Sequence, residues 1–231
     1  MQNDTATTQP SDTDAAPGAQ LPTDAHPPTD DVRSIYARAS ALTTDVLAAI
    51  EPAQYDLPTP CETMTVAELC EHLVMVQRRV ACAGRDVPVQ EWPIDASDVP
   101  AGEWAAAFAE ASHDVQASWP AEVLDRPTAL PWGTFPGRDA LAVYVNELIV
   151  HAWDLAQPTG LEPAWEDEVL LVADASIHAQ LPDADRRAMW DQFAAMLPDE
   201  VEWEDPFGNA VPVPEDAPLI DRLVAWNGRQ P

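Results

Sequence analysis

Apolar residues recur at spacings of three and four along most of the chain, which is the pattern of helices that bury one face. In the first such segment the apolar positions include Ile35, Leu42 and Val46. The pattern predicts a helical protein, an all-α fold. The expected helices are Asp31–Ile50, Val66–Ala83, Glu103–Trp119, Arg138–Ala156, Trp165–Gln180, Asp183–Leu197 and Pro218–Trp226.

Capping residues and helix breakers indicate where these helices begin and end. Asp30 or Asp31 can cap the first helix, and Thr63 or Thr65 can cap the second. Pro158-Thr159-Gly160 is expected to end the fourth helix. Residues 120–138 are expected to be irregular. A small β-hairpin is expected at 201–213, where Gly208-Asn209 separates two short apolar runs.

The first 30 residues differ in composition from the rest of the chain. They are mostly Thr, Asp, Pro, Gln and Ala, and large apolar residues are almost absent. Such a segment cannot bury enough apolar surface to offset the entropy lost on ordering. We therefore expect a disordered tail at 1–30 and a single domain at 31–231, whose last part, about 183–231, is a short C-terminal extension.

The charge of the chain narrows the range of partners. Asp and Glu number 40 against 11 basic residues, and the net charge is −29. An acidic excess of this size repels phosphate backbones and anionic lipids, so neither nucleic acid nor a membrane is an expected partner. No stretch approaches the roughly 18 apolar residues of a membrane span, and no basic segment followed by an apolar core marks a signal peptide.

The three cysteines favour a reducing compartment. Cys61, Cys70 and Cys82 are few and odd in number, and they form no Cys-x-x-Cys motif. A disulfide scaffold is therefore not expected, and the protein is expected to be cytoplasmic. Cys70 and Cys82 fall in the second helix as packing residues.

A carboxylate and an imidazole lie four residues apart in the apolar fourth helix. Glu147 and His151 share one helix face, and a buried carboxylate is costly unless it is paired or bound to a metal. His72 borders the apolar face of the second helix. Two imidazoles and one carboxylate suit a first-row divalent metal and leave coordination positions open for water or substrate.

Each of these residues also has a simpler interpretation. His151 could be a histidine at the edge of the core that bonds to Glu147, and His72 could be half-exposed without a ligand. Asp154, three residues after His151, is expected to support the site or the fold rather than to be a fourth ligand. Trp153 is expected in the core.

Three separated stretches resemble a known family of bacterial metal-binding proteins. They are Thr59–Val74, Pro131–Gly137 followed by Glu147–Ala156, and Leu223–Pro231. The family is related to mycothiol-dependent maleylpyruvate isomerase and to the broader DinB-like group. The similarity covers the chain from about residue 31 to its end.

The resemblance implies a DinB-like four-helix bundle with extra C-terminal helices. It also implies a divalent metal, zinc first, with nickel, iron or manganese as alternatives, held by His72, Glu147 and His151. In thiol-dependent members the open metal site is thought to activate a small thiol such as mycothiol. Two departures stand out: Met64 occupies the usual position of a tryptophan, and the isomerase's C-terminal domain with its substrate-binding arginine has no clear counterpart. Neither Arg222 nor Arg229 is assigned a catalytic role.

The leading functional hypothesis is a thiol-dependent metalloenzyme of the transferase or isomerase type. Its partners would be a small-molecule thiol and an electrophilic substrate, and the protein would be a monomer or homodimer. Cys61 is a candidate site-lining thiol, or else a small packed cysteine where the second helix begins. The alternatives are a metal-dependent hydrolase that activates water at the same site, and a metal-binding protein with a structural or stress role.

Overall fold

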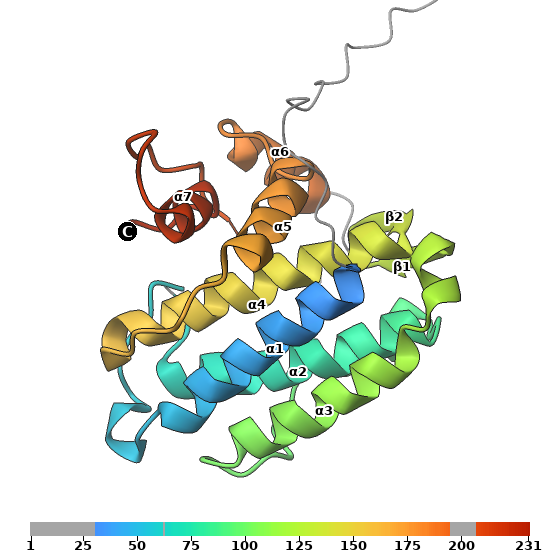
Figure 1. Cartoon of the computed structure of the whole chain (residues 1–231), viewed down its shortest axis with the longest axis horizontal. Coiled ribbons are helices and arrows are strands. Elements are labelled where there is room, and N and C mark those ends of the chain that lie inside the picture. Colours follow the sequence, from blue (N-terminus) through green and yellow to red (C-terminus); the bar gives the residue numbers. More distant parts are fainter. Residues whose placement is uncertain (1–30, 62, 195–206) are drawn as a thin grey trace, which may run out of the picture.

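Four long helices pack side by side as a bundle (Figure 1). The computed structural model describes residues 31–61, 63–194 and 207–231, and the predicted tail lies outside them. Contacts join α1 to α3 and α4, and α2 to α3 and α4, so the helices form a ring. This confirms the expected all-α bundle. Its helices are α1 (Val32–Ala49), α2 (Val66–Gly84), α3 (Trp104–Ser118) and α4 (Gly137–Thr159).

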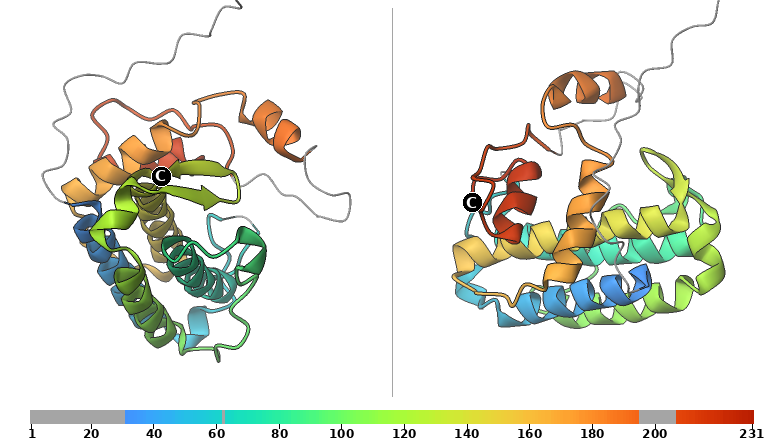
Figure 2. Two further views of the ribbon diagram at one scale, coloured as in Figure 1. Left: turned by 90° about the vertical axis from the view of Figure 1, so that its right-hand side faces the viewer. Right: turned by 45° about the horizontal axis from the view of Figure 1, so that its top comes forward.

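The helices run in two directions, and α2 and α4 are antiparallel neighbours (Figures 1 and 2). Gln54, which follows α1, donates to the Thr159 carbonyl at the end of α4, so α1 and α4 end together. Arg126, which follows α3, donates to the Ala83 and Gly84 carbonyls at the end of α2. The middle of α2 therefore faces the middle of α4.

Local capping explains where the first two helices begin. The Asp31 carboxylate accepts from the Arg33 amide at 3.0 Å, which confirms Asp31 as the cap of α1. Thr65 and Glu68 form a reciprocal capping box at the start of α2. Thr65, rather than Thr63, is thus the cap of the helix that carries His72.

The helix α4 is longer than the sequence pattern predicts. It passes through Pro158 and ends after Thr159, whereas an end near Ala156 was expected. Pro158 lacks the N–H that would donate to the carbonyl four residues earlier, so α4 continues for one more residue without that hydrogen bond. Gly160 adopts a left-handed conformation with φ 71°, and its amide donates to the Ala156 carbonyl at 2.9 Å.

The hairpin lies in a different place from the one predicted. Strands β1 (Pro127–Leu130) and β2 (Gly133–Pro136) pair antiparallel within the segment expected to be irregular, just before α4. Pro127 faces Pro136 at the open end of the ladder, where a missing N–H costs least. The predicted hairpin was wrong for 207–213, which is not strand, and 201–206 lie outside the described residues.

Three more helices follow the bundle in the described residues. They are α5 (Asp167–His178), α6 (Arg186–Ala194) and α7 (Leu219–Trp226), and each begins later than predicted. Two of them, α5 and α7, pack against one side of the bundle. Helix α5 packs on α4 and α1, and α7 packs on α5 and α4 (Figure 2). Buried Arg186 ties the segment together by donating to the carbonyls of Pro182, Gly208 and Trp226. Across the described ranges, no helix combines the length and apolar character needed to cross a membrane.

A substitution of the glycine at the start of α4 tests how closely this end of the bundle is packed. Gly137 lies against the short helix η3 (Ala121–Asp125), and an added Cβ would stand 2.0 Å from the Val123 carbonyl oxygen. We expect Gly137→Ala to lower the free energy of unfolding by about 2 kcal/mol and Tm by roughly 4–8 °C, measured by thermal denaturation. Gly208→Ala is the control, because nothing lies within 4 Å of its Cβ position. An unchanged Tm for Gly137→Ala would contradict the close approach.

Candidate metal centre

Helices α2 and α4 bring the three predicted ligands together. The Glu147 Oε1 atom lies 3.1 Å from His72 Nε2 and 3.3 Å from His151 Nε2. The two imidazole rings are 5.0 Å apart at an interplanar angle of 79°, so they converge from different directions. One donor atom from each residue lies within 4.8 Å of the other two. The predicted residues thus form one cluster, while the metal itself stays a proposal.

The spacing of the donor atoms fits a small divalent cation. Ligands at about 2.0 Å from a tetrahedral zinc ion lie about 3.3 Å from one another. The carboxylate oxygen of Glu147 already lies at that separation from both imidazole nitrogens. Nitrogen and oxygen donors of this kind also suit iron, nickel and manganese. The chemistry of the donor set therefore fits the metal that the sequence resemblance implies.

The cluster is buried on one side and accessible on the other. The His151 side chain is 8% exposed, whereas those of His72 and Glu147 are 21% and 22% exposed. A cavity of about 240 Å³ adjoins His72. Its other lining residues come from α2 and the following connector: Glu68, Glu71, Met75, Ile94, Asp95 and Ala96. A small molecule could therefore reach the cluster from the side of His72.

His151 has a carboxylate partner at each ring nitrogen. Its Nε2 faces Glu147, and its Nδ1 lies 3.0 Å from the Asp154 Oδ2 atom one turn later on α4. Asp154 is 0% exposed and accepts two further hydrogen bonds from Arg229, from Nη2 at 3.0 Å and from Nε at 3.2 Å. The expected supporting role of Asp154 agrees with this geometry, and Arg229 joins it from the C-terminal segment.

The charges in the cluster favour a cation next to Glu147. Burial opposes ionisation of Glu147, but His151 and His72 outweigh it and hold its pKa well below the ordinary value. Burial likewise opposes the charged form of His151, but the carboxylates of Glu147 and Asp154 raise its pKa to about 9. The site is therefore electronegative enough to retain a proton at neutral pH, and a metal ion would replace that proton.

A second group of donors overlaps the first, but the cationic side chain of Arg229 already lies against it. Cys61, His151 and Asp154 also place one donor atom each within 4.8 Å of one another. The Arg229 guanidinium lies against this group, on Asp154 and beside Cys61. Burial raises the pKa of the Cys61 thiol to about 11, although Arg229 opposes that rise. Cys61 therefore lies beside His151 and Asp154, and the group of His72, Glu147 and His151 is the better candidate for a metal.

Two further polar side chains lie near Glu147. Tyr144 is one turn earlier on α4, and Arg79 is two turns after His72 on α2, close enough for their charges to interact. Burial lowers the pKa of Arg79, and Tyr144 and Glu147 oppose that change. The Arg79 Nε atom donates to the Pro93 carbonyl at 2.7 Å. Within the described residues, no carboxylate forms an ion pair with Arg79.

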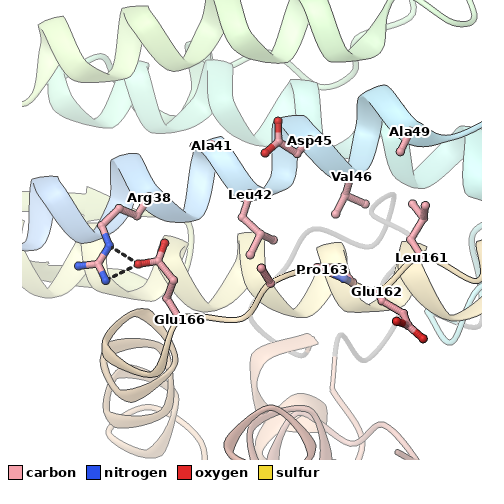
Figure 3. A pocket seen from close by; sticks show the side chains of 11 residues that line it. Arg38, Ala41, Leu42, Asp45, Val46, Ala49, Leu161, Glu162, Pro163 and Glu166 are labelled. Carbon is pink, nitrogen blue, oxygen red and sulfur yellow. Dashed lines mark hydrogen bonds and ion pairs between the residues drawn. The ribbon is translucent and has the colours of Figure 1, made fainter.

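The larger hollow of about 460 Å³ lies elsewhere (Figure 3). It is lined by α1 and the connector after α4, with Leu42, Val46 and Leu161 along its apolar part. At one end Arg38 donates to Glu166. Because none of the clustered histidines or acids lines it, we do not assign it to the candidate site.

The family of the chain follows from a comparison with known families. Residues 36–156, just over half of the chain, match the family described as the mycothiol maleylpyruvate isomerase N-terminal domain. The chain belongs to this family. The match includes the DinB-like bundle, all three clustered ligand candidates and Asp154, but it ends well before Arg229.

The chain also resembles proteins of similar length. Two uncharacterized proteins of Mycobacterium tuberculosis, from strains CDC 1551 / Oshkosh and ATCC 25618 / H37Rv, are each 29% identical over 203 residues. The alignment covers 84% of this chain and 95% of each relative. No solved structure matches. These relatives support a shared architecture over most of the chain and name no activity.

The structure also settles what the sequence pattern left open around the site. His113 is exposed on α3 and belongs to neither group of donors among the described residues. Trp153 is buried in the core, which was also expected. Arg229 is the residue of this hydrogen-bonded group to which the sequence assigned no role. Its only signal was indirect: Asp154 lies on a buried helix face and requires a partner.

Substitution of Glu147 tests whether this residue serves a binding site or stabilises the fold through an ion pair. In chelator-treated protein we expect Glu147→Leu to change the free energy of unfolding little, because His72 and His151 can lose a proton and become neutral once the carboxylate is gone. Asp154→Leu on the same helix is the control, with an expected loss of about 3 kcal/mol because buried Arg229 loses its partner. Chemical denaturation measures both. A loss of 2 kcal/mol or more in Glu147→Leu, on the order of a broken buried pair, would assign Glu147 to the fold instead.

Proposed function

We propose that this protein binds a divalent metal at His72, Glu147 and His151 and uses it, with a small thiol of the mycothiol type, to act on a small electrophile. The observation that carries the proposal is the convergence of these three side chains from two antiparallel helices, with one side open to a cavity. The family match supports the thiol, since the family is described by a mycothiol-dependent isomerase. The reaction class would be transfer or isomerisation.

The three candidate ligands would differ in charge, and Asp154 would set the orientation of one of them. His72 and His151 would supply neutral nitrogen donors, and Glu147 would supply a negative oxygen. A zinc ion held there, or a similar divalent cation, would supply positive charge that favours the deprotonated form of a bound thiol or water. Asp154 would fix the direction of the His151 ring, because a hydrogen bond at Nδ1 directs Nε2 toward the cluster.

The cavity beside His72 would take the organic part of the ligands. Met75, Ile94 and Ala96 offer it apolar contact, and Glu71 and Asp95 offer hydrogen-bond acceptors. Acceptors of this kind suit the hydroxyl or amino groups of a polar thiol. The cysteines are free, which supports a reducing compartment such as the cytoplasm for this thiol chemistry.

Arg79 would be available for an anionic group on the substrate. It is a half-buried cation near Glu147 that pairs with no carboxylate among the described residues, although the chain carries 40 acidic residues. A guanidinium binds a carboxylate through two parallel hydrogen bonds. An electrophile with a carboxylate near its reactive carbon would suit this arrangement.

Metal content provides the first test. Elemental analysis of purified protein should find about one divalent ion per chain in the wild type. His72→Ala, Glu147→Ala and His151→Ala should each lose at least about 90% of it, because each removes a donor and metal affinity falls by tenfold or more even when only supporting groups are lost. His113→Ala, with an exposed histidine on α3, is the matched control and should retain the metal. Retention in any one of the three would remove that residue from the ligand set.

Thiol dependence provides the second test. With zinc-loaded protein, we expect mycothiol to accelerate consumption of a small electrophile, and His72→Ala to abolish the acceleration. The reason is that the thiolate, rather than the thiol, is the nucleophile. Parallel rates without thiol measure activation of water. Turnover without thiol would favour the hydrolase alternative, and a metal-loaded protein inactive in both assays would favour the non-catalytic one.

A further inference from the structure

The C-terminal segment reaches into the candidate metal centre through Arg229. This arginine lies 75 residues after Asp154 and outside the range that matches the family. Its guanidinium donates to both carboxylate oxygens of Asp154, and the same Oδ2 atom lies 3.0 Å from His151 Nδ1. Arg229, Asp154 and His151 thus form one continuous chain of hydrogen bonds that ends at the candidate ligand.

We infer that Arg229 is a positioning residue of the metal centre, so that the site of this chain is completed by its C-terminal segment. The inference rests on the proposed metal binding. Arg229 holds Asp154, Asp154 holds the Nδ1 side of His151, and the Nε2 atom is thereby directed toward Glu147 and His72. A carboxylate that orients a histidine ligand is itself held by a buried cation.

The burial of Asp154 and Arg229 explains why Asp154 needs this arginine. Asp154 is 0% exposed and Arg229 is 7% exposed, so solvent cannot replace either partner. Asp154 takes part in three contacts of hydrogen-bond length, and two of them come from Arg229. Without the guanidinium, the carboxylate would be a buried charge facing the imidazole alone, and it would turn away or recruit water. Either change would release the His151 ring from its fixed orientation.

The backbone around Arg229 is built to deliver this side chain. Asn227 is fully buried and forms a reciprocal amide pair with Asn146 of α4, at 3.1 and 2.9 Å. Gly228 adopts a left-handed conformation with φ 82°, which few residues other than glycine adopt. The Arg229 amide then donates to the Val224 carbonyl at 2.9 Å. The end of α7 is thus fixed to α4 two turns before Asp154, and Arg229 spans the remaining distance.

Arg229 also separates the two overlapping donor groups. The guanidinium lies where the carboxylate of Asp154 and the thiol of Cys61 meet, so it supplies the positive charge on that side of His151. A metal ion is therefore confined to the other side, with Glu147 and His72. In this respect Arg229 defines which of two possible cation positions is used.

The inference predicts a specific loss of metal affinity. Competition with a chromophoric chelator measures zinc affinity, and the visible absorption of the cobalt(II) form reports ligand geometry. We expect Arg229→Met to bind zinc at least tenfold more weakly and to show an altered cobalt spectrum, as does Asp154→Asn. Arg229→Lys keeps the charge and should recover part of the affinity. Circular dichroism verifies that each variant is folded. If Arg229→Met does not fold, the zinc affinities and cobalt spectra of Asp154→Asn and Arg229→Lys test the inference.

A matched control distinguishes positioning from general stability. Arg186 is also fully buried in the C-terminal segment, but it donates to backbone carbonyls and not to Asp154. Arg186→Met should lower Tm yet keep the zinc affinity and the cobalt spectrum of the wild type. Wild-type affinity and spectrum in the folded Arg229 and Asp154 variants would overturn the inference and leave the proposed metal site intact. A wild-type protein that binds no zinc would overturn both.

Discussion

The structure depends on how α4 compensates the charged groups that it carries into the interior. Glu147, His151 and Asp154 lie within eight residues of one helix, among side chains that are otherwise apolar and buried. Each buried charge is costly by itself. Glu147 is met by two imidazoles from two helices, and Asp154 is met by an imidazole and a guanidinium. The bundle supplies the imidazoles of His72 and His151, and the C-terminal segment supplies the guanidinium of Arg229.

Much of this arrangement could be predicted from the sequence, because it depends on local pattern. The four bundle helices follow from apolar spacing, and the Glu147–His151 pair follows from the helical repeat alone. His72 was a candidate because it borders the apolar face of its helix, and the resemblance to a known family strengthened its assignment, since spacing within one helix says nothing about a neighbouring helix. The hairpin at 127–136 was missed because Pro127 and Pro136 disfavour strands, yet they lie at its open end, where no ladder bond is lost. Arg229 could not be predicted, because a contact across 75 residues leaves no periodic signal.

The division between the family domain and the C-terminal segment bears on function. The family match contains His72, Glu147 and His151, and all three lie on two helices of the four-helix bundle. The rigidity of one donor, however, comes from α7 and the residues after it. Rigid donors bind metals more selectively than mobile ones, because the geometry is fixed before the ion arrives. The proposed metal binding would therefore be coupled through His151 to docking of the C-terminal segment, and each would stabilise the other.

The overall charge constrains which molecules the centre can act on. A net charge of −29 attracts metal cations and repels anionic substrates. The cavity beside His72 carries three carboxylates and would reinforce that repulsion. Arg79 is the exception near Glu147, because within the described residues it has no carboxylate partner. An anionic electrophile would therefore have to approach along the side of Arg79, while a polar neutral or cationic thiol would enter beside His72.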